Sequence, residues 1–159
     1  MECFNSIQPQ NGAAFHGFLT GSTQKIPKKG LYYELNKSKQ TATVIGPEDK
    51  NLKKITIPAK IKVGTIYYRV TAVAAKAFRN CRKATEATIG KNVTSIGRDA
   101  FSGCRKLKKL TFKTKKLKTV GKNAFRNLNK ALSVRCPRKV KGAYEKLLKK
   151  AGVPKVTWR

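Results

Sequence analysis

One segment of about twelve residues occurs three times in this chain, and the interval between its copies constrains the fold more than any other feature. The copies begin at Val70, Val93 and Leu117, so the periods are 23 and 24 residues. Repeats of this length are typical of solenoids, in which each coil buries its apolar side chains on its neighbours. Solenoids present extended surfaces, so the repeat favours a binding function over an enclosed active site.

The middle copy, Val93–Leu110, carries the fullest pattern: Val-Thr-x-Ile-Gly-x-x-Ala-Phe-x-x-Cys, followed by two Leu at intervals of three. The copy at Val70–Ala87 has Ala at both Leu sites, and the copy at Leu117–Val134 has Leu at the Cys site. The pattern closely resembles the BspA-type leucine-rich repeat over about residues 50–136. Three copies in phase make this resemblance specific for the fold.

The resemblance implies a leucine-rich-repeat solenoid and a role at a surface. Proteins with this repeat are typically surface-associated in bacteria and some protozoa, and several are implicated in adhesion to host matrix proteins or to other cells. The family offers no catalytic residue set to transfer, and a fold alone does not define a function. The resemblance therefore implies a non-enzymatic adhesion module.

The sequence predicts an α+β repeat fold, a short leucine-rich-repeat solenoid of β-strands and short helical turns with an N-terminal β-hairpin and a C-terminal helical cap. Residues 1–24 are predicted to be a loose leader, and residues 25–159 a single domain. Within that domain we expect a β-rich N-terminal cap at 25–69, the repeats at 70–136 and the C-terminal cap at 137–159.

Runs of β-branched and aromatic residues predict the strands of the N-terminal cap. Leu31–Leu35 and Thr41–Ile45 are expected to pair as the hairpin. Ile55–Ile57 and Thr65–Val70 are expected to follow as strands, with a turn at Lys62–Gly64.

Each repeat is expected to contain a short strand, a tight helical turn and a second strand, which in the middle copy are residues 93–96, 100–104 and 107–112. Helical spacing of apolar residues predicts a capping helix at 142–152, and residues 153–158 are expected to add a closing strand.

The apolar positions of the second strand recur from copy to copy and predict the columns of the core. They are Leu107, Leu110 and Phe112, matched by Ala84, Ala87 and Ile89 before them and by Ala131, Val134 and Cys136 after them. Phe78, Phe101 and Phe125 occupy one column and are expected to form a buried aromatic ladder. Cys81 and Cys104 share a column with Leu128, which indicates core packing, although a disulfide between them is conceivable in an oxidising compartment.

The net charge is the second feature that bears on function. There are 37 Lys and Arg residues against 7 Asp and Glu, which gives a net charge of +30. This excess raises the local concentration of any polyanion. Lysine outnumbers arginine 28 to 9, and lysine lacks the planar fork with which arginine recognises bases. The balance favours diffuse electrostatic adhesion over sequence-specific recognition of nucleic acid.

Basic residues at repeat-matched positions are the best candidates for a binding site. Stacked coils would place each of them above its counterpart in the previous coil, although lysines also occur on exposed faces simply because they favour solubility. The candidates in matched columns are Lys83, Lys106 and Lys130 with Arg82 and Arg105, and a second set on or beside the repeat strands contains Lys109, Lys113 and Arg135.

Other chemistry is disfavoured by spacing. The four cysteines contain no C-x-x-C pair and His16 is remote, so no metal site is expected, and no nucleophile, phosphate loop or carboxylate pair indicates an enzyme or a cofactor. In the pairs Tyr32–Tyr33 and Tyr67–Tyr68 one ring should point outward, where it could serve a ligand.

The expected partner is an acidic protein or an anionic polysaccharide such as a wall polymer, and nucleic acid would bind only nonspecifically. Two alternatives stay open: an intracellular nucleic-acid-binding protein, and a purely structural repeat segment of a larger surface protein. The expected location is the cell surface or the extracellular space, with the cytoplasm as the alternative, because no signal peptide is visible and no apolar run approaches the ~18 residues of a membrane span.

Overall fold

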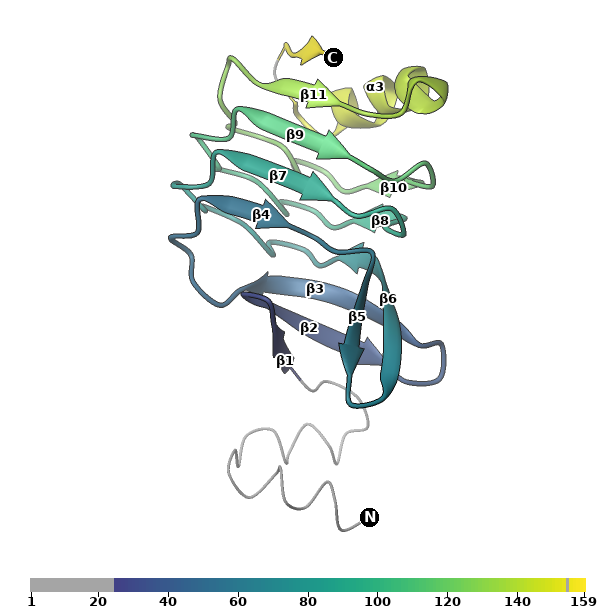
Figure 1. Ribbon diagram of the computed structural model, residues 1–159. Coiled ribbons are helices and arrows are strands. Elements are labelled where there is room, and N and C mark those ends of the chain that lie inside the picture. Colours follow the sequence, from purple (N-terminus) through teal and green to yellow (C-terminus); the bar gives the residue numbers. More distant parts are fainter. Residues whose placement is uncertain (1–24, 154) are drawn as a thin grey trace.

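Two β-sheets line a stack of coils in the computed structural model, which describes residues 25–153 and 155–159 (Figure 1). The seven-stranded sheet has the order β1-β2-β3-β6-β8-β10, with β5 paired to β6, and the five-stranded sheet has the order β12-β11-β9-β7-β4. The predicted leader at 1–24 lies outside the described residues.

The described residues form twelve strands, divided between the two sheets, and two short helices. The strands of the seven-stranded sheet are β1 Lys25–Lys28, β2 Leu31–Asn36, β3 Thr41–Pro47, β5 Lys60–Val63, β6 Ile66–Val73, β8 Ser95–Ile96 and β10 Thr119–Val120. Those of the five-stranded sheet are β4 Lys54–Thr56, β7 Glu86–Ile89, β9 Lys109–Phe112, β11 Ser133–Arg135 and β12 Thr157–Trp158. The helices are the short 3₁₀ helix η2, Arg138–Val140, and α3, Lys141–Lys150.

Parallel pairing in register holds the coils of the five-stranded sheet together. Glu86 lies opposite Lys109, and Lys109 lies opposite Ser133. Neighbouring strands of these pairs come from successive coils of the chain, so residues 23 or 24 positions apart in sequence lie side by side. This is the solenoid that the sequence predicts.

The N-terminal part confirms one prediction and corrects another. Strands β2 and β3 pair antiparallel as the expected hairpin. The turn predicted at 62–64 is wrong, because Lys62 and Val63 belong to strand β5, which pairs antiparallel with β6. The turn consists instead of Gly64 and Thr65. Gly64 has φ 60°, the positive angle that a two-residue hairpin turn requires at its first position.

The segment that contains each Phe is a series of tight turns rather than the predicted helical turn. In the middle coil the amide of Ser102 donates to the carbonyl of Asp99 and that of Cys104 to the carbonyl of Phe101. Gly103, with φ 80°, then redirects the chain before a helix can form. Asn80 and Asn127 take the same left-handed conformation one coil before and one coil after. Backbone hydrogen bonds between coils continue through these turns.

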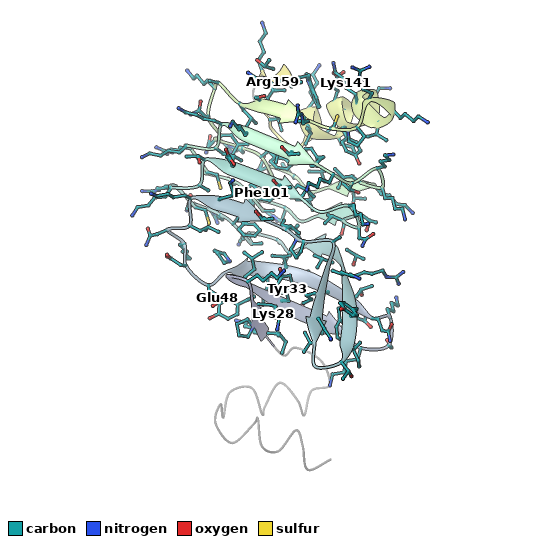
Figure 2. The ribbon with its side chains drawn as sticks, viewed as in Figure 1. Lys28, Tyr33, Glu48, Phe101, Lys141 and Arg159 are labelled. Atoms are coloured by element: carbon teal, nitrogen blue, oxygen red, sulfur yellow. The ribbon has the colours of Figure 1, made fainter. Side chains whose placement is uncertain are left out.

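A ladder of aromatic rings fills the space between the sheets, as predicted. The centroids of Phe78 and Phe101 are 5.1 Å apart and those of Phe101 and Phe125 are 5.3 Å apart, with interplanar angles of 16° and 5°. All three side chains are fully buried, and Figure 2 shows Phe101 inside the stack.

The core columns are confirmed in the first two coils and shift in the third. Ala131 was expected to point inward but is exposed, and Leu132 is buried in its place. The side-chain amide oxygen of Asn129 accepts a hydrogen bond from the amide of Ala131 at 2.8 Å, which forms a turn there and moves the inward position by one residue. Cys136 is only half-buried, because the last coil has no full coil above it.

Helix α3 closes the C-terminal end of the stack through one buried tyrosine. The ring of Tyr144 packs edge-on against Phe112, with centroids 5.5 Å apart. Its hydroxyl donates a hydrogen bond to the carbonyl of Thr114 at 2.8 Å and accepts one from the amide of Leu117 at 3.2 Å. Strand β12 then pairs in parallel with β11, so the predicted helical cap and closing strand are both present.

Glycines occur where two coils approach too closely for a side chain. A Cβ atom built on Gly97 would lie 2.4 Å from the backbone nitrogen of Ala75, and one built on Gly121 would lie 2.3 Å from that of Arg98. The equivalent residue of the first coil is Ala74, whose amide donates to the carbonyl of Val44 in strand β3, which belongs to the N-terminal cap and not to a Phe-bearing coil. At this repeat position Gly is therefore needed where one Phe-bearing turn rests on another.

The Phe ladder should be the largest single contribution to stability. Replacement of Phe101 by Ala removes the ring that contacts both other members and leaves a cavity, so we expect the free energy of unfolding to fall by about 3–5 kcal/mol. Urea denaturation followed by circular dichroism measures this change. A loss below ~1 kcal/mol would contradict the importance of the ladder.

The close approach at Gly97 gives a second prediction. Gly97→Ala should lower the midpoint of thermal unfolding, because the added methyl group meets backbone atoms that cannot rotate away. Gly142→Ala is the matched control, since a Cβ at that position has no neighbour within 4 Å. The control should leave the midpoint unchanged or raise it slightly, and equal destabilisation by both substitutions would contradict the steric explanation.

Candidate functional site

Basic side chains project from both edges of the stack (Figure 2). All eight residues that the sequence singles out are exposed. The structure divides them among three places: the edge where β7, β9 and β11 begin, the outer face of the five-stranded sheet, and the opposite edge.

The first group is a column of basic residues on neighbouring coils. We call it the lysine ladder, and its members are Lys83, Lys106 and Lys130 together with Arg82 and Arg105. The backbone keeps these coils in register on both sides of the column. On one side the amide of Gly103 donates to the carbonyl of Arg126, and on the other the amide of Lys108 donates to the carbonyl of Thr85. Successive members therefore lie about 5 Å apart along the stack.

The third step of the ladder differs from the first two because Asn129 stands where the earlier coils have Arg. Its side-chain amide donates a hydrogen bond to the carbonyl of Arg105 at 3.3 Å, so it joins the two coils instead of adding a charge. A shallow hollow of about 510 Å³ lies beside it, lined by Arg105, Asn127, Leu128, Asn129 and Lys130. The hollow is open to solvent and has two cations at its rim.

The outer face of the five-stranded sheet carries Lys109 and Arg135 from the predicted set. Lys109 is paired: its ammonium lies 3.2 Å from one carboxylate oxygen of Glu86, and Lys54 lies 3.0 Å from the other. Hydrogen bonds from Lys54 and Lys109 hold the pKa of Glu86 below its usual range. Thus Glu86 joins three strands through one carboxylate, and Lys109 is less available to a ligand than the ladder.

The structure does not bring all eight residues together. Lys113 follows β9 at the opposite edge of the stack from Lys106. Six residues of mostly extended chain separate the two, a distance of about 20 Å. Lys113 therefore belongs to a different surface, which it shares with the exposed lysines 115, 116 and 118.

A further basic cluster on the β5–β6 hairpin was missed by the sequence reasoning, apart from its tyrosine. Tyr67 points outward and Tyr68 inward, so the expected alternation is confirmed. Lys60 and Lys62 lie near the Tyr67 ring, with ammonium-to-centroid distances of 4.3 and 5.5 Å. The alternation of Lys60 and Lys62 around the apolar Ile61 is the signal that a strand, rather than a turn, occupied this segment.

Two cysteines of the described residues belong to the core. Cys81 and Cys104 are fully buried and unbonded to each other, and the thiol of Cys104 donates to the carbonyl of Phe78 at 3.1 Å. A hydrogen bond with Cys81 and burial raise the pKa of the Cys104 thiol. The thiol is therefore neutral at ordinary pH and a poor nucleophile or metal ligand.

The described residues, 25–153 and 155–159, offer neither a metal site nor a helix that could cross a membrane. No three residues among their His, Cys, Asp and Glu side chains are grouped so that they could hold a metal ion. No helix among the described residues is long and apolar enough to cross a membrane.

Comparison with known proteins agrees with the architecture. The profile of the family described as BspA type leucine rich repeat region matches residues 48–157 in six copies, which extends the repeat beyond the three clear copies in the sequence. No curated protein matches the chain.

Solved structures of bacterial proteins have the same fold. One is a leucine rich cell surface protein from Faecalibacterium prausnitzii A2-165, with a TM-score of 0.59 and 23% identity over 88% of this chain and 44% of that protein. Another is a leucine-rich repeat protein from Bacteroides capillosus ATCC 29799, with a TM-score of 0.63 and 19% identity over 85% of this chain and 98% of that protein. The chain thus spans less than half of the first protein and almost all of the second.

The carboxylate shared by Lys54 and Lys109 should make stability depend on pH. The pKa of Glu86 is lowered in the folded state, so its contribution is present above the ordinary value of 4.5 and is lost as the pH falls through the folded value. We expect Glu86→Gln to unfold at a lower temperature than the unaltered protein at pH 7. The difference should shrink below pH 4.5, and a difference independent of pH would contradict the role of the charge.

Proposed function

The chain belongs to the BspA-type leucine-rich repeat family, and we propose that it holds an anionic partner on the lysine ladder. Leucine-rich repeats are generally non-enzymatic binding modules, and the fold is consistent with a protein-binding or adhesion module. The specific proposal concerns the chemistry of the partner and the edge of the coils that binds it.

The single observation that carries the proposal is a column of exposed cations without acidic partners. Among the described residues the ion pairs join Lys54 and Lys109 to Glu86, and Arg98 to Asp99. None of them involves a member of the ladder. Lys83, Lys106 and Lys130 therefore face solvent as unneutralised charges, each stacked on the next.

Stacking like charges has an energetic cost that a partner would relieve. Two unit charges about 4–5 Å apart repel each other by roughly 1 kcal/mol in water before salt screens them. Like charges on neighbouring strands are destabilising for this reason. A polymer with regularly spaced anionic groups would place its charges between the cations and convert repulsion into attraction.

The partner that fits this column is an acidic protein or an anionic polysaccharide such as a wall polymer. Lysine ammonium groups bind such partners as point charges without base-specific geometry. A solved structure of the same fold is described as that of a cell surface protein. A location at the cell surface is part of the proposal for this chain.

Charge removal from the ladder tests the proposal. We expect the triple variant Lys83→Ser, Lys106→Ser and Lys130→Ser to elute from a heparin column at a salt concentration roughly 0.1 M lower than the unaltered protein, because fewer counterions are released on binding. Circular dichroism verifies the fold, which should be retained because all three side chains are exposed.

The matched control removes the same charge from one loop instead of one column. It is the triple variant Lys115→Ser, Lys116→Ser and Lys118→Ser, whose side chains are also exposed. The control should change elution less than the ladder variant. Equal changes would mean that binding follows net charge rather than the ladder. Stronger retention on duplex DNA than on heparin would instead support the nucleic-acid alternative.

A further inference from the structure

The β5–β6 hairpin exposes apolar surface in a way the coils do not. Ile66 is 44% exposed and Tyr67 is 51% exposed, and among the described residues these are the large hydrophobic side chains that face solvent to this extent. Strand β5 pairs only with β6, so the hairpin extends away from the stack at the N-terminal end (Figure 1). The inward face of the same hairpin, with Ile61 and Tyr68, is buried. Tyr67 is therefore the large exposed side chain of the outward face, whereas Ile66 lies on the face of Ile61 and Tyr68 and is exposed where it pairs with Val63 next to the hairpin turn.

Three cations share that outward face with Tyr67. Lys62 lies directly opposite Tyr67 across the two strands, and Lys60 lies opposite Arg69. The ammonium of Lys60 sits 4.3 Å from the centroid of the tyrosine ring. A cation is attracted to the face of an aromatic ring, so the ring helps to hold the two lysines in place.

No acid of the described residues forms an ion pair with these cations. Lys60 and Arg69 form a cross-strand pair of like charges, an arrangement that costs stability in an antiparallel hairpin. The result is a compact group of three unneutralised cations around one exposed ring. We call it the hairpin patch, defined as Lys60, Lys62, Tyr67 and Arg69.

We propose that the hairpin patch is a second binding site and that it binds an acidic polysaccharide chain, whose units carry sulfate or carboxylate groups. A sugar unit of such a polymer presents an apolar C–H face and an anionic group together. The exposed ring of Tyr67 supplies the apolar contact, and Lys60, Lys62 and Arg69 supply the charge. The patch therefore matches both chemical features of one monomer.

Two other classes of polymer fit the patch less well. Single-stranded nucleic acid binds on platforms where several aromatic rings stack successive bases, whereas this patch has a single ring. An acidic peptide that adds a strand to a sheet reads the open edge of a strand, whereas these four side chains project from the flat face of the hairpin. The polysaccharide assignment follows from the combination of one ring with three cations on a face.

This site is independent of the proposed role of the lysine ladder. The ladder lies at the edge of the stack where β7, β9 and β11 begin. The hairpin lies at the N-terminal end of the stack, on the side away from that edge (Figure 1). The ring also gives the patch a contribution that salt does not screen, which a column of lysines lacks. Each site is tested by its own variants.

The experiment measures the binding of a heparin-derived octasaccharide to the full chain by titration calorimetry at 0.15 and 0.3 M salt. Tyr67→Ala should weaken binding roughly fivefold at both salt concentrations, and Tyr67→Phe should bind as the unaltered protein does. The double variant Lys60→Ser and Lys62→Ser should weaken binding about tenfold at the lower salt and less at the higher salt. Amide resonances of residues 60–69 should shift on titration.

The matched control is the double variant Lys37→Ser and Lys39→Ser. It removes the same charge at the same spacing from the exposed turn between β2 and β3 and should change affinity less than twofold. If Tyr67→Ala binds as tightly as the unaltered protein, or if the two lysine variants behave alike, the hairpin patch is not the site. If Tyr67→Ala weakens binding of oligothymidylate or polyglutamate more than binding of the octasaccharide, the assignment to polysaccharide is wrong. The same titrations on the triple ladder variant Lys83→Ser, Lys106→Ser and Lys130→Ser separate the two sites. Tyr67→Ala should weaken binding in that protein as well, and an effect of Tyr67→Ala only when the ladder is intact would contradict a separate site.

Discussion

The fold depends on one constraint, the parallel register between successive coils. Backbone hydrogen bonds run from coil to coil through the strands and through the turns that carry the Phe residues. A slip of one residue would turn every inward side chain outward. Because the register is kept, Phe78, Phe101 and Phe125 stack at about the spacing of the strands, and each buries its faces on the next ring.

The same register produces the charged surface. Each side chain at a matched repeat position lies above the corresponding side chain of the previous coil. This holds for side chains that point into the core and for those that point into solvent. Apolar columns gain stability from this arrangement, since each ring removes its neighbour from water. Basic columns lose stability from it, because the charges of Lys83, Lys106 and Lys130 add to one another. The favourable stacking of apolar side chains in the core thus compensates for the repulsion between basic side chains on the surface. Glu86 reduces that repulsion locally, because its carboxylate lies between Lys54 and Lys109.

The sequence predicted the repeating part of the fold well, because periodicity is a direct consequence of stacking. The Phe ladder, the β2–β3 hairpin and the capping helix could all be identified from spacing and composition. The failures lie where a local interaction overrides the period. Asn129 forms a turn that replaces Ala131 by Leu132 in the core, and left-handed Gly103 prevents the expected helical turn.

The candidate site was predictable in its residues but not in its grouping. Exposure of the eight basic residues followed from their repeat positions, whereas the separation of Lys113 from Lys106 depends on the path of the chain around the coil. The pairing of Lys109 with Glu86 required the cross-strand register, and the cluster around Tyr67 required the true position of the hairpin turn. Each of these is a relation between two segments, which a single repeat pattern does not contain.

The buried hydroxyl of Tyr144 makes the C-terminal end of the stack cooperative with its interior. It accepts a hydrogen bond from the amide of Leu117 and donates one to the carbonyl of Thr114, so helix α3 is fastened to the segment that leads into the last Phe-bearing turn. Fraying from this terminus must first extract the ring from its contact with Phe112, which exposes two orphaned backbone groups at once. The last coil and the helix should consequently unfold as one unit rather than residue by residue. The buried tyrosine thus prevents the stepwise loss of repeats from the C-terminal end of the array.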